Sequence, residues 1–208
     1  MCDNLLGITN QLELRNEEEK LSKIRAKELF DFDVINDFGV GTYQGLKDIH
    51  YYLFQDIYPF AGKERATNIS KGSFQFTPVI YLNASLKQID KMPMSTFDEI
   101  VEKYVEMNIA HPFKDGNGRS TRIWLDIILR KNLKRVIDWN LIDKEDYLLA
   151  MERSPIKDIE IKFFLNKALT SKIDDRKTYL TGIDISFYYE NFTSYLINEI
   201  SRSNNQLT

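Results

Sequence analysis

Apolar side chains recur at helical spacing along most of the chain, and short polar or proline-containing segments separate one run from the next. Side chains three and four residues apart share one face of a helix, so each run predicts an amphipathic helix. The apolar positions of the helix near residue 80 include Ile80, Tyr81, Leu86 and Ile89. The pattern predicts a mostly α fold with helices over residues 17–30, 43–58, 78–89, 96–110, 117–131, 143–151, 155–169 and 184–200.

The clearest boundaries surround residue 111. Thr96 and Glu99 have the spacing of a capping box, in which each side chain bonds the backbone N–H of the other at the start of a helix. That helix is expected to end at Ala110–His111, because Pro112 disfavours helical geometry in the residue before it. Residues 111–122 should therefore form a loop between two helices, with its tail on the first turns of the second.

Two short alternating segments interrupt the helical pattern between residues 66 and 77. Thr67–Ser70 and Ser73–Phe76 carry the β-branched and aromatic residues typical of strands, and Lys71-Gly72 lies between them as a turn. This arrangement predicts a β-hairpin. The pattern alone fits two interpretations equally well. The hairpin could be a surface feature without a partner, or its strand edge could bind another protein segment.

Composition narrows the class of protein. A chain of 208 residues suits one large domain, and its net charge of −3 without a basic stripe argues against DNA binding. A single cysteine excludes a disulfide framework. The N-terminus lacks the pattern of a signal peptide, and no apolar run is long enough to span a membrane, so the cytoplasm is the expected location.

The loop at 111–122 gathers side chains suited to a metal-bound polyphosphate. His111 supplies a base that titrates near neutrality, and Asp115 supplies a hard oxygen ligand for Mg²⁺. The glycines at 116 and 118 allow a close backbone approach, and N–H groups at a helix start bind anions. Arg119 and Arg122 lie three residues apart on one helix face, where their planar guanidinium groups suit phosphate oxygens.

Each of these residues also has a structural explanation. A histidine after a helix can serve as a cap, Asp-Gly and Asn-Gly are common turn dipeptides, and two arginines can form a solvated face. These explanations leave the contiguity of the residues unaccounted for. The other histidine, His50, differs because it lies with Ile49 and Leu53 on an apolar helix face, which predicts a histidine in the core or at its boundary.

The run HPFKDGNGRSTR, from His111 to Arg122, resembles the signature of the Fic family, HPFx(D/E)GNGRxxR, and matches every defined position. The resemblance implies a single Fic domain over residues 1–208. Its fold would be a Fic-type helical bundle with a small β-hairpin flap at about 66–77 and a catalytic loop at 111–122. Most Fic proteins transfer AMP from ATP to a protein hydroxyl.

The resemblance also implies a role for each motif residue. His111 would take the proton from a target Tyr, Ser or Thr hydroxyl, Asp115 would hold Mg²⁺, and the target would dock on the flap as an added strand. An arginine rather than a lysine at position 119 favours nucleotidyl over phosphoryl transfer. The implied contacts to ATP are made by Gly116, Asn117, Gly118, Arg119 at the β-phosphate and Arg122 at the γ-phosphate.

A second run, SFYYEN from Ser186 to Asn191, resembles the family's inhibitory signature (S/T)xxxE(G/N). The resemblance implies an inhibitory helix at about 184–200, in which Glu190 pairs with Arg122 and so removes the group that orients the γ-phosphate. The pattern is also that of a plain amphipathic helix that packs on the core. In this class of Fic protein, relief of inhibition involves self-modification, for which the candidates are Tyr188, Tyr189 and Tyr195.

Three functions stay open on the sequence. The first is a protein adenylyltransferase held in check by its own C-terminal helix. The second is a hydrolase that removes AMP from modified proteins in the same site. The third is a nucleotide-sensing regulator without enzymatic activity. Such a protein would not need His111, Asp115 and Arg119 in combination, so the intact motif argues against it. The family class also implies a homo-oligomer.

Overall fold

The computed structural model describes residues 3–72 and 74–201, most of which are helical. The predicted mostly α fold is confirmed. The helices are α1 (Gln11–Asp31), α2 (Tyr43–Phe54), α3 (Val79–Lys91), α4 (Phe97–Ala110), α5 (Asn117–Leu133), α6 (Lys144–Arg153), α7 (Ile159–Lys167) and α8 (Arg176–Tyr188), with the 3-10 turns η1 (Val34–Asn36) and η2 (Trp139–Leu141). The strands are β1 (Ser70–Lys71), β2 (Phe74–Gln75), β3 (Val136–Ile137) and β4 (Leu169–Thr170).

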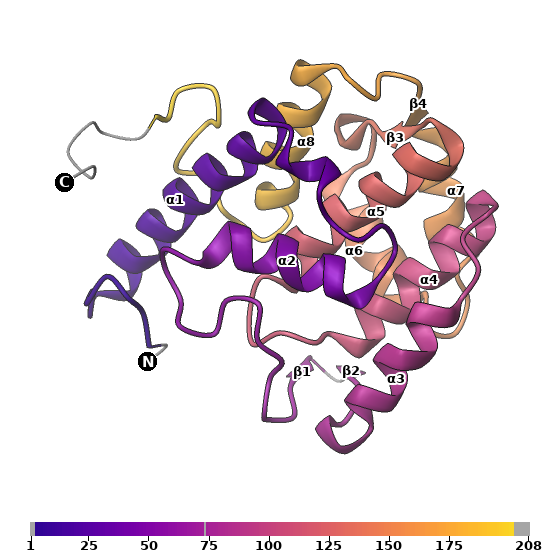
Figure 1. The fold of residues 1–208 in the computed structure, drawn as a ribbon, viewed down its shortest axis with the longest axis horizontal. Coiled ribbons are helices and arrows are strands. Elements are labelled where there is room, and N and C mark those ends of the chain that lie inside the picture. The colour runs from indigo at the N-terminus through magenta and orange to yellow at the C-terminus, as the bar shows by residue number, and fades with distance from the viewer. Residues whose placement is uncertain (1–2, 73, 202–208) are drawn as a thin grey trace.

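Helix α5 forms the centre of the molecule. It packs against α2, α4 and α8, and α1 closes the bundle by packing against α2 and α8 (Figure 1). Trp124, Leu125, Ile128 and Leu129 of α5 are fully buried. Because the core surrounds α5, the first turn of this helix is held in a fixed place, and the loop at 111–116 leads directly into it.

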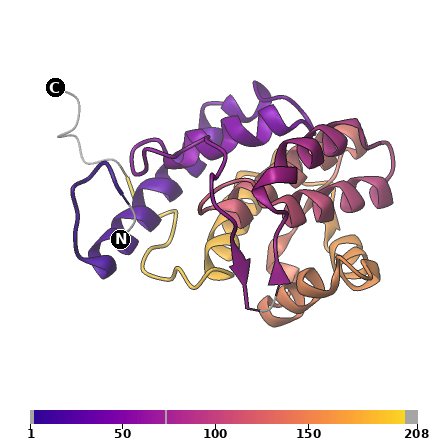
Figure 2. The same cartoon turned by 90° about the horizontal axis from the view of Figure 1, so that it is seen from below.

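The predicted hairpin is present, although its strands are short. β1 and β2 pair antiparallel, with Ser70 opposite Gln75 and Lys71 opposite Phe74. Figure 2 shows the two strands extending from the helical body toward the segment that holds α6. A second two-stranded sheet, β3 with β4, was not predicted, because two-residue strands carry too little alternation to be recognised.

The predicted helix at 184–200 is wrong in both of its boundaries. The helix begins at Arg176, where Asp175 caps it, and ends at Tyr188. Asn191 then adopts a left-handed conformation (φ 64°), and the chain turns back along α1 instead of continuing the helix. The helical spacing of Phe192, Leu196 and Ile200 suggested a longer helix, but Phe192 and Ile200 are buried from an irregular segment.

Two details of the predicted helices also differ from the structure. In α3 the buried positions are Leu82, Leu86 and Ile89, whereas the side chains of Ile80 and Tyr81 are 81% and 60% exposed. A stripe with spacing of four and three residues therefore faces the core, and the two preceding residues lie on the other side. Helix α7 begins at Ile159, not at the predicted proline.

Within residues 3–72 and 74–201, every helix is too short or too polar to span a lipid bilayer.

Candidate active site

The end of α4 places His111. The predicted capping box of Thr96 and Glu99 is present at the start of this helix. At its other end, His111 is the C-cap and adopts a left-handed conformation (φ 47°), an uncommon state for a residue other than glycine. This conformation turns the chain out of the helix just before Pro112, as the sequence predicts.

The imidazole of His111 is largely enclosed and uncharged. Its ring stacks on Phe76 of the hairpin with 3.7 Å between centroids, and Nδ1 lies 3.3 Å from the carbonyl oxygen of Asn108. Burial is the main cause that lowers its pKa to about 4. A donor Nδ1–H would leave Nε2 as the basic nitrogen, so at neutral pH the ring can accept a proton.

The interior of the loop is held by amide and aromatic contacts. Phe113 is fully buried, and its backbone N–H and carbonyl both bond the side chain of Asn117, at 2.9 and 2.8 Å. The amide of Asn117 is therefore committed to shaping the loop. Because the side-chain amide of Asn117 is engaged in this way, its backbone N–H is the group that can donate to a phosphate.

His50 braces the same loop from α2. Its ring stacks on Phe113 at 3.9 Å, its Nδ1 accepts a hydrogen bond from the backbone of Gly62, and its Nε2 contacts the carbonyl of Asp115 at 2.8 Å. Burial lowers its pKa to about 3. The prediction of a core histidine is confirmed. The brace on the loop was missed, because no local pattern links residues 50 and 115.

The first turn of α5 opens into a cavity of about 530 Å³. The first N–H groups of a helix have no partner within it and carry partial positive charge, so this turn is suited to bind an anion. The loop, the hairpin, α6 and the turn after α8 all contribute walls. The lining includes His111, Asp115, Gly116, Asn117, Gly118, Arg122, Glu190, Phe74, Phe76, Tyr147, Leu148 and Met151.

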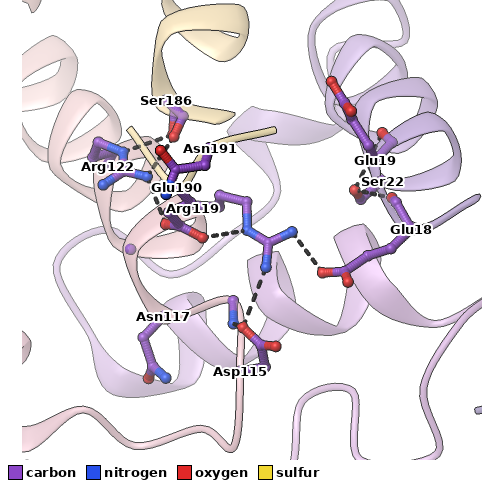
Figure 3. Close-up of polar contacts among 12 residues, drawn as sticks. Glu18, Glu19, Ser22, Asp115, Asn117, Arg119, Arg122, Ser186, Glu190 and Asn191 are labelled. Atoms are coloured by element: carbon purple, nitrogen blue, oxygen red, sulfur yellow. Dashed lines mark hydrogen bonds and ion pairs between the residues drawn. The ribbon is translucent and has the colours of Figure 1, made fainter. Parts of the chain in front are cut away.

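Two buried arginines of α5 share one carboxylate. Glu190 lies 2.8 Å from Arg122 through Oε1 and 2.8 Å from Arg119 through Oε2 (Figure 3). Arg122 also donates to the hydroxyl of Ser186 at 2.6 Å and to its carbonyl at 2.8 Å. Burial would raise the pKa of Glu190, but the two guanidinium groups outweigh it and hold this pKa below its usual range.

Arg119 is surrounded by three carboxylates. Besides Glu190, it contacts Glu18 of α1 at 2.7 Å and Asp115 at 3.3 Å, and the hydroxyl of Tyr58 donates to Glu18 at 2.7 Å. With Arg122 included, the cluster holds two positive charges and three negative ones. A carboxylate at position 190 therefore makes this side of the cavity unfavourable for a polyphosphate.

The sequence pattern of the Fic/DOC family matches residues 41–129, which include the loop and the whole anion-binding turn. The chain contains a Fic/DOC domain. It is 30% identical over 160 residues to the protein adenylyltransferase VbhT of Bartonella schoenbuchensis, a match that covers 71% of this chain and 32% of that protein. The chain thus spans about a third of this relative.

Other Fic relatives match a larger share of their own length. A probable protein adenylyltransferase, y4lH, of Sinorhizobium fredii is 28% identical over 163 residues, which cover 73% of this chain and 81% of that protein. The crystal structure of BepC from Bartonella tribocorum with bound AMPPNP superposes with a TM-score of 0.64 at 16% identity. The superposition covers 81% of this chain and 91% of the BepC chain, and this likeness establishes the Fic fold.

The structure brings most of the expected Fic motif residues to one cavity, with one difference at Arg119. Its side chain is 1% exposed and lies behind the cavity wall, held by the three carboxylates, whereas Arg122 reaches the cavity. The tyrosines also differ: Tyr189 is buried and donates to the carbonyl of Ile142, while the side chain of Tyr188 is 45% exposed. Tyr195 is partly buried in the segment beside α1.

Sequence reasoning missed the contribution of α1. Glu18 is separated from Arg119 by 101 residues, and only the fold brings the two together. A glutamate in a charged stretch of an amphipathic helix resembles a solvated residue. The available signal was weak: Glu18 lies close to Leu14 and Leu21 on the helix face that packs inward.

Proposed function

We propose that the protein is an adenylyltransferase that moves AMP from ATP to a hydroxyl of a protein. One observation carries the proposal: a neutral, cavity-lining imidazole at His111 faces the same cavity as the first turn of α5 and Arg122. A base and an anion-binding turn in one cavity suit attack by an alcohol on a phosphate. The relatives named as protein adenylyltransferases support this assignment.

In the proposed reaction, His111 accepts the proton of the target hydroxyl as its oxygen attacks the α-phosphorus of ATP. The bond between the α-phosphorus and the bridging oxygen breaks, and pyrophosphate leaves. The backbone at Gly116–Gly118 and the guanidinium of Arg122 orient the triphosphate. Because little covalent chemistry is asked of the protein, positioning and charge stabilisation supply most of the rate enhancement.

Asp115 fits the magnesium ion that such a reaction uses. Its side chain is 53% exposed at the cavity, and its contacts within the protein involve Oδ1, which bonds the N–H of Gly116 and Arg119. Mg²⁺ favours hard oxygen ligands and is usually held by one or two carboxylates together with phosphate oxygens. When bound, the ion would supply charge neutralisation at the phosphates. Arg119 would then act mainly through its contact to Asp115 rather than as a direct phosphate ligand.

The hairpin is the proposed docking edge for the target. β1 and β2 are short and largely exposed, and Phe76, the residue after β2, stacks on His111. A segment that pairs with this edge would therefore run close to the base. Such pairing uses backbone groups and tolerates many target sequences. ATP as substrate makes the cytoplasm our expected compartment, and self-association stays a prediction.

We also propose that the segment after α8 inhibits the reaction. Glu190 occupies both guanidinium groups and adds negative charge where the γ-phosphate would lie. A phosphate cannot take the place at Arg122 until this carboxylate leaves. Removal of AMP is a second candidate activity of the same site, because Glu190 lines the cavity with His111 and could orient a water molecule.

The test uses the Glu190→Gly variant incubated with ATP and Mg²⁺. We expect self-modification to rise at least about tenfold over the parent chain, because an obstructing ion pair at the phosphate site is removed. Intact-mass spectrometry should show an adduct of one AMP group, and the Glu190→Gly/His111→Ala double variant should show none while it still binds ATP. Equal labelling of parent and Glu190→Gly would exclude the inhibitory role, and transfer of phosphate alone would exclude adenylyl transfer.

A further inference from the structure

A buried arginine joins the hairpin to the end of α4. Arg65 is 5% exposed, and its guanidinium donates to four backbone carbonyls. Nε bonds the carbonyl of His111 at 2.8 Å, and Nη2 bonds that of Ala110 at 3.2 Å. Nη1 bonds the carbonyl of Thr67 at 2.8 Å, and Nη2 also bonds that of Thr77.

These partners belong to two different elements. Ala110 and His111 end α4, whereas Thr67 and Thr77 bracket the two strands of the hairpin. The backbone adds to the same connection, because the N–H of Arg65 donates to the carbonyl of Pro112 at 2.9 Å and that of Thr77 donates to Ile109 at 3.0 Å. One guanidinium therefore fixes the spacing between the hairpin and the loop that carries His111.

Burial of the charged guanidinium of Arg65 costs free energy, so a positioning role would explain why an arginine lies there. Among the described residues, no carboxylate lies within ion-pair distance of its guanidinium, so this buried charge is balanced by carbonyl dipoles alone. The C-terminal end of α4 offers partial negative charge, which favours a cation there. A lysine would satisfy the charge but could not spread over four carbonyls, because only the planar guanidinium offers five fixed donors.

We propose that Arg65 is a positioning residue for the transfer reaction, which holds the hairpin in register with His111. The inference rests on the proposed function, since it assumes that a target docks on the hairpin and that His111 is the base. Arg65 fixes both partners of one stack: it binds the carbonyl of His111, and it binds Thr77 directly after Phe76, whose ring lies 3.7 Å from the imidazole. A displacement of about 1 Å at a reacting group can cost on the order of a hundredfold in rate.

Arg65 also contributes to the charge environment of His111. Burial lowers the pKa of His111 most, and the positive charges of Arg65 and Lys71 lower it further. The hydrogen bond to Asn108 and the negative charge of Glu190 raise it. Removal of Arg65 therefore raises the pKa of His111 through two causes, the loss of a nearby cation and the exposure of a loosened loop to solvent. If Arg65 only stabilised the fold at a distance from His111, its removal would leave the pKa of His111 unchanged.

The experiment compares Arg65→Gln and Arg65→Lys in the Glu190→Gly background with a matched control, Lys103→Gln. Lys103 is likewise buried and donates to carbonyls at the end of a helix, those of Asp90 and Met92 beside α3, but it lies away from the cavity. Four quantities are measured: kcat for AMP transfer, the Kd of a non-hydrolysable ATP analogue, Tm, and the pKa of His111 by NMR. The chain has two histidines, so the His111 signal is assigned by comparison with His111→Ala.

For Arg65→Gln we expect kcat to fall roughly tenfold to a hundredfold while Kd changes less than about threefold, because the base and not the phosphate turn is displaced. The pKa of His111 should rise from its lowered value in the Glu190→Gly background toward its ordinary value. Arg65→Lys should keep most of the pKa shift yet lose kcat, and Lys103→Gln should alter Tm alone. Arg65→Gln that lowers Tm but keeps the parent kcat and His111 titration would overturn the proposal.

Two further outcomes stay decisive. If Arg65→Gln does not fold, Arg65→Lys decides, because it retains the charge: parental kcat in that variant overturns the proposal, and reduced kcat with parental Kd supports it. If the Glu190→Gly background transfers no AMP, the proposed function fails. The NMR titration then still tests Arg65: a changed pKa of His111 in Arg65→Gln means that Arg65 positions His111, and an unchanged pKa means that it only stabilises the fold.

Discussion

At the scale of single residues, the two histidines show how surroundings decide chemistry. Burial lowers the pKa of His50 to about 3 and that of His111 to about 4, so both rings are neutral under ordinary conditions. His50 has both nitrogens engaged, by Gly62 and by the carbonyl of Asp115. His111 contacts the carbonyl of Asn108 through Nδ1, and its ring lies against the cavity. The same type of side chain thus braces the loop from α2 at His50 and is the proposed base at the end of α4 at His111.

The first prediction concerns pH. Since the pKa of His111 is lowered, its basic form is fully present above about pH 5 and is lost only as the pH falls through about 4. In Glu190→Gly the loss of a negative neighbour lowers the pKa further. The kcat/KM of AMP transfer by this variant should therefore stay flat from pH 8 to about pH 5.5. An acid limb centred near the ordinary histidine value would contradict the assignment.

Folding must be followed over the same pH range as a control. Both histidines have a lower pKa in the folded chain than in the unfolded chain, so the unfolded chain binds protons first. The free energy of unfolding should accordingly decrease as the pH falls below about 6.5. Circular dichroism at each pH separates this loss of stability from titration of the base.

At the scale of elements, the sequence predicted the helices around the site well and the C-terminal segment poorly. The capping box of α4, the break at Pro112 and the start of α5 are signalled by local residue types, and each is present. The end of α8 is decided by distant contacts: Glu19 of α1 accepts the N–H groups of Ser194 and Tyr195. Local periodicity carries no information about such distant partners. For the same reason the sequence did not predict the contact of Glu18 with Arg119 or that of Arg65 with His111.

The second prediction tests the turn between α4 and α5. Gly116 adopts φ 73°, and a Cβ at this position would lie 2.4 Å from a ring carbon of Phe54, which is itself buried. Gly116→Ala should therefore lower the free energy of unfolding by about 3 kcal/mol, from backbone strain and overpacking together. Gly7→Ala isolates the strain, because Gly7 has φ 68° and nothing within 4 Å of a Cβ. Its cost should be about 1 kcal/mol.

Urea denaturation of the two variants gives the comparison. The difference between them measures the close approach of Gly116 to Phe54, which the strain of a left-handed residue alone cannot supply. If the two substitutions cost the same, the turn does not depend on contact with α2. Loss of ATP binding by folded Gly116→Ala would in addition support the backbone of this turn as the phosphate site.

At the scale of the whole molecule, the turn at residues 190–191, which we propose to be inhibitory, is tied to helix α1. Arg15 of α1 donates to the carbonyls of Glu190 and Asn191 at 3.1 and 2.8 Å, and its guanidinium lies 4.4 Å from the centroid of the Phe192 ring. Farther along α1, Lys23 bonds the carbonyl of Tyr195 at 2.6 Å and pairs with Asp184 at 2.9 Å. Helix α1 therefore holds the segment after α8 in the position that keeps Glu190 on the arginines.

This arrangement gives the third prediction, Arg15→Ala. Arg15 is exposed, so its removal should leave the fold intact while the turn loses two hydrogen bonds, which together stabilise it by about 1 to 1.5 kcal/mol. If that free energy goes into the equilibrium between the closed and the open turn, AMP transfer should rise roughly fivefold to tenfold. The gain should be smaller than in Glu190→Gly, because the carboxylate itself is still present.

Two comparisons decide whether the effect passes through Glu190. Arg176→Ala is the matched control, because this exposed arginine also joins α8 to α1, through Asp31 at 2.6 and 2.9 Å, but far from the cavity. It should leave AMP transfer unchanged. In the Glu190→Gly background Arg15→Ala should add nothing, since the residue that it releases is already absent. An increase of similar size in both backgrounds would mean that Arg15 acts on the cavity directly and that α1 does not hold the inhibitory turn.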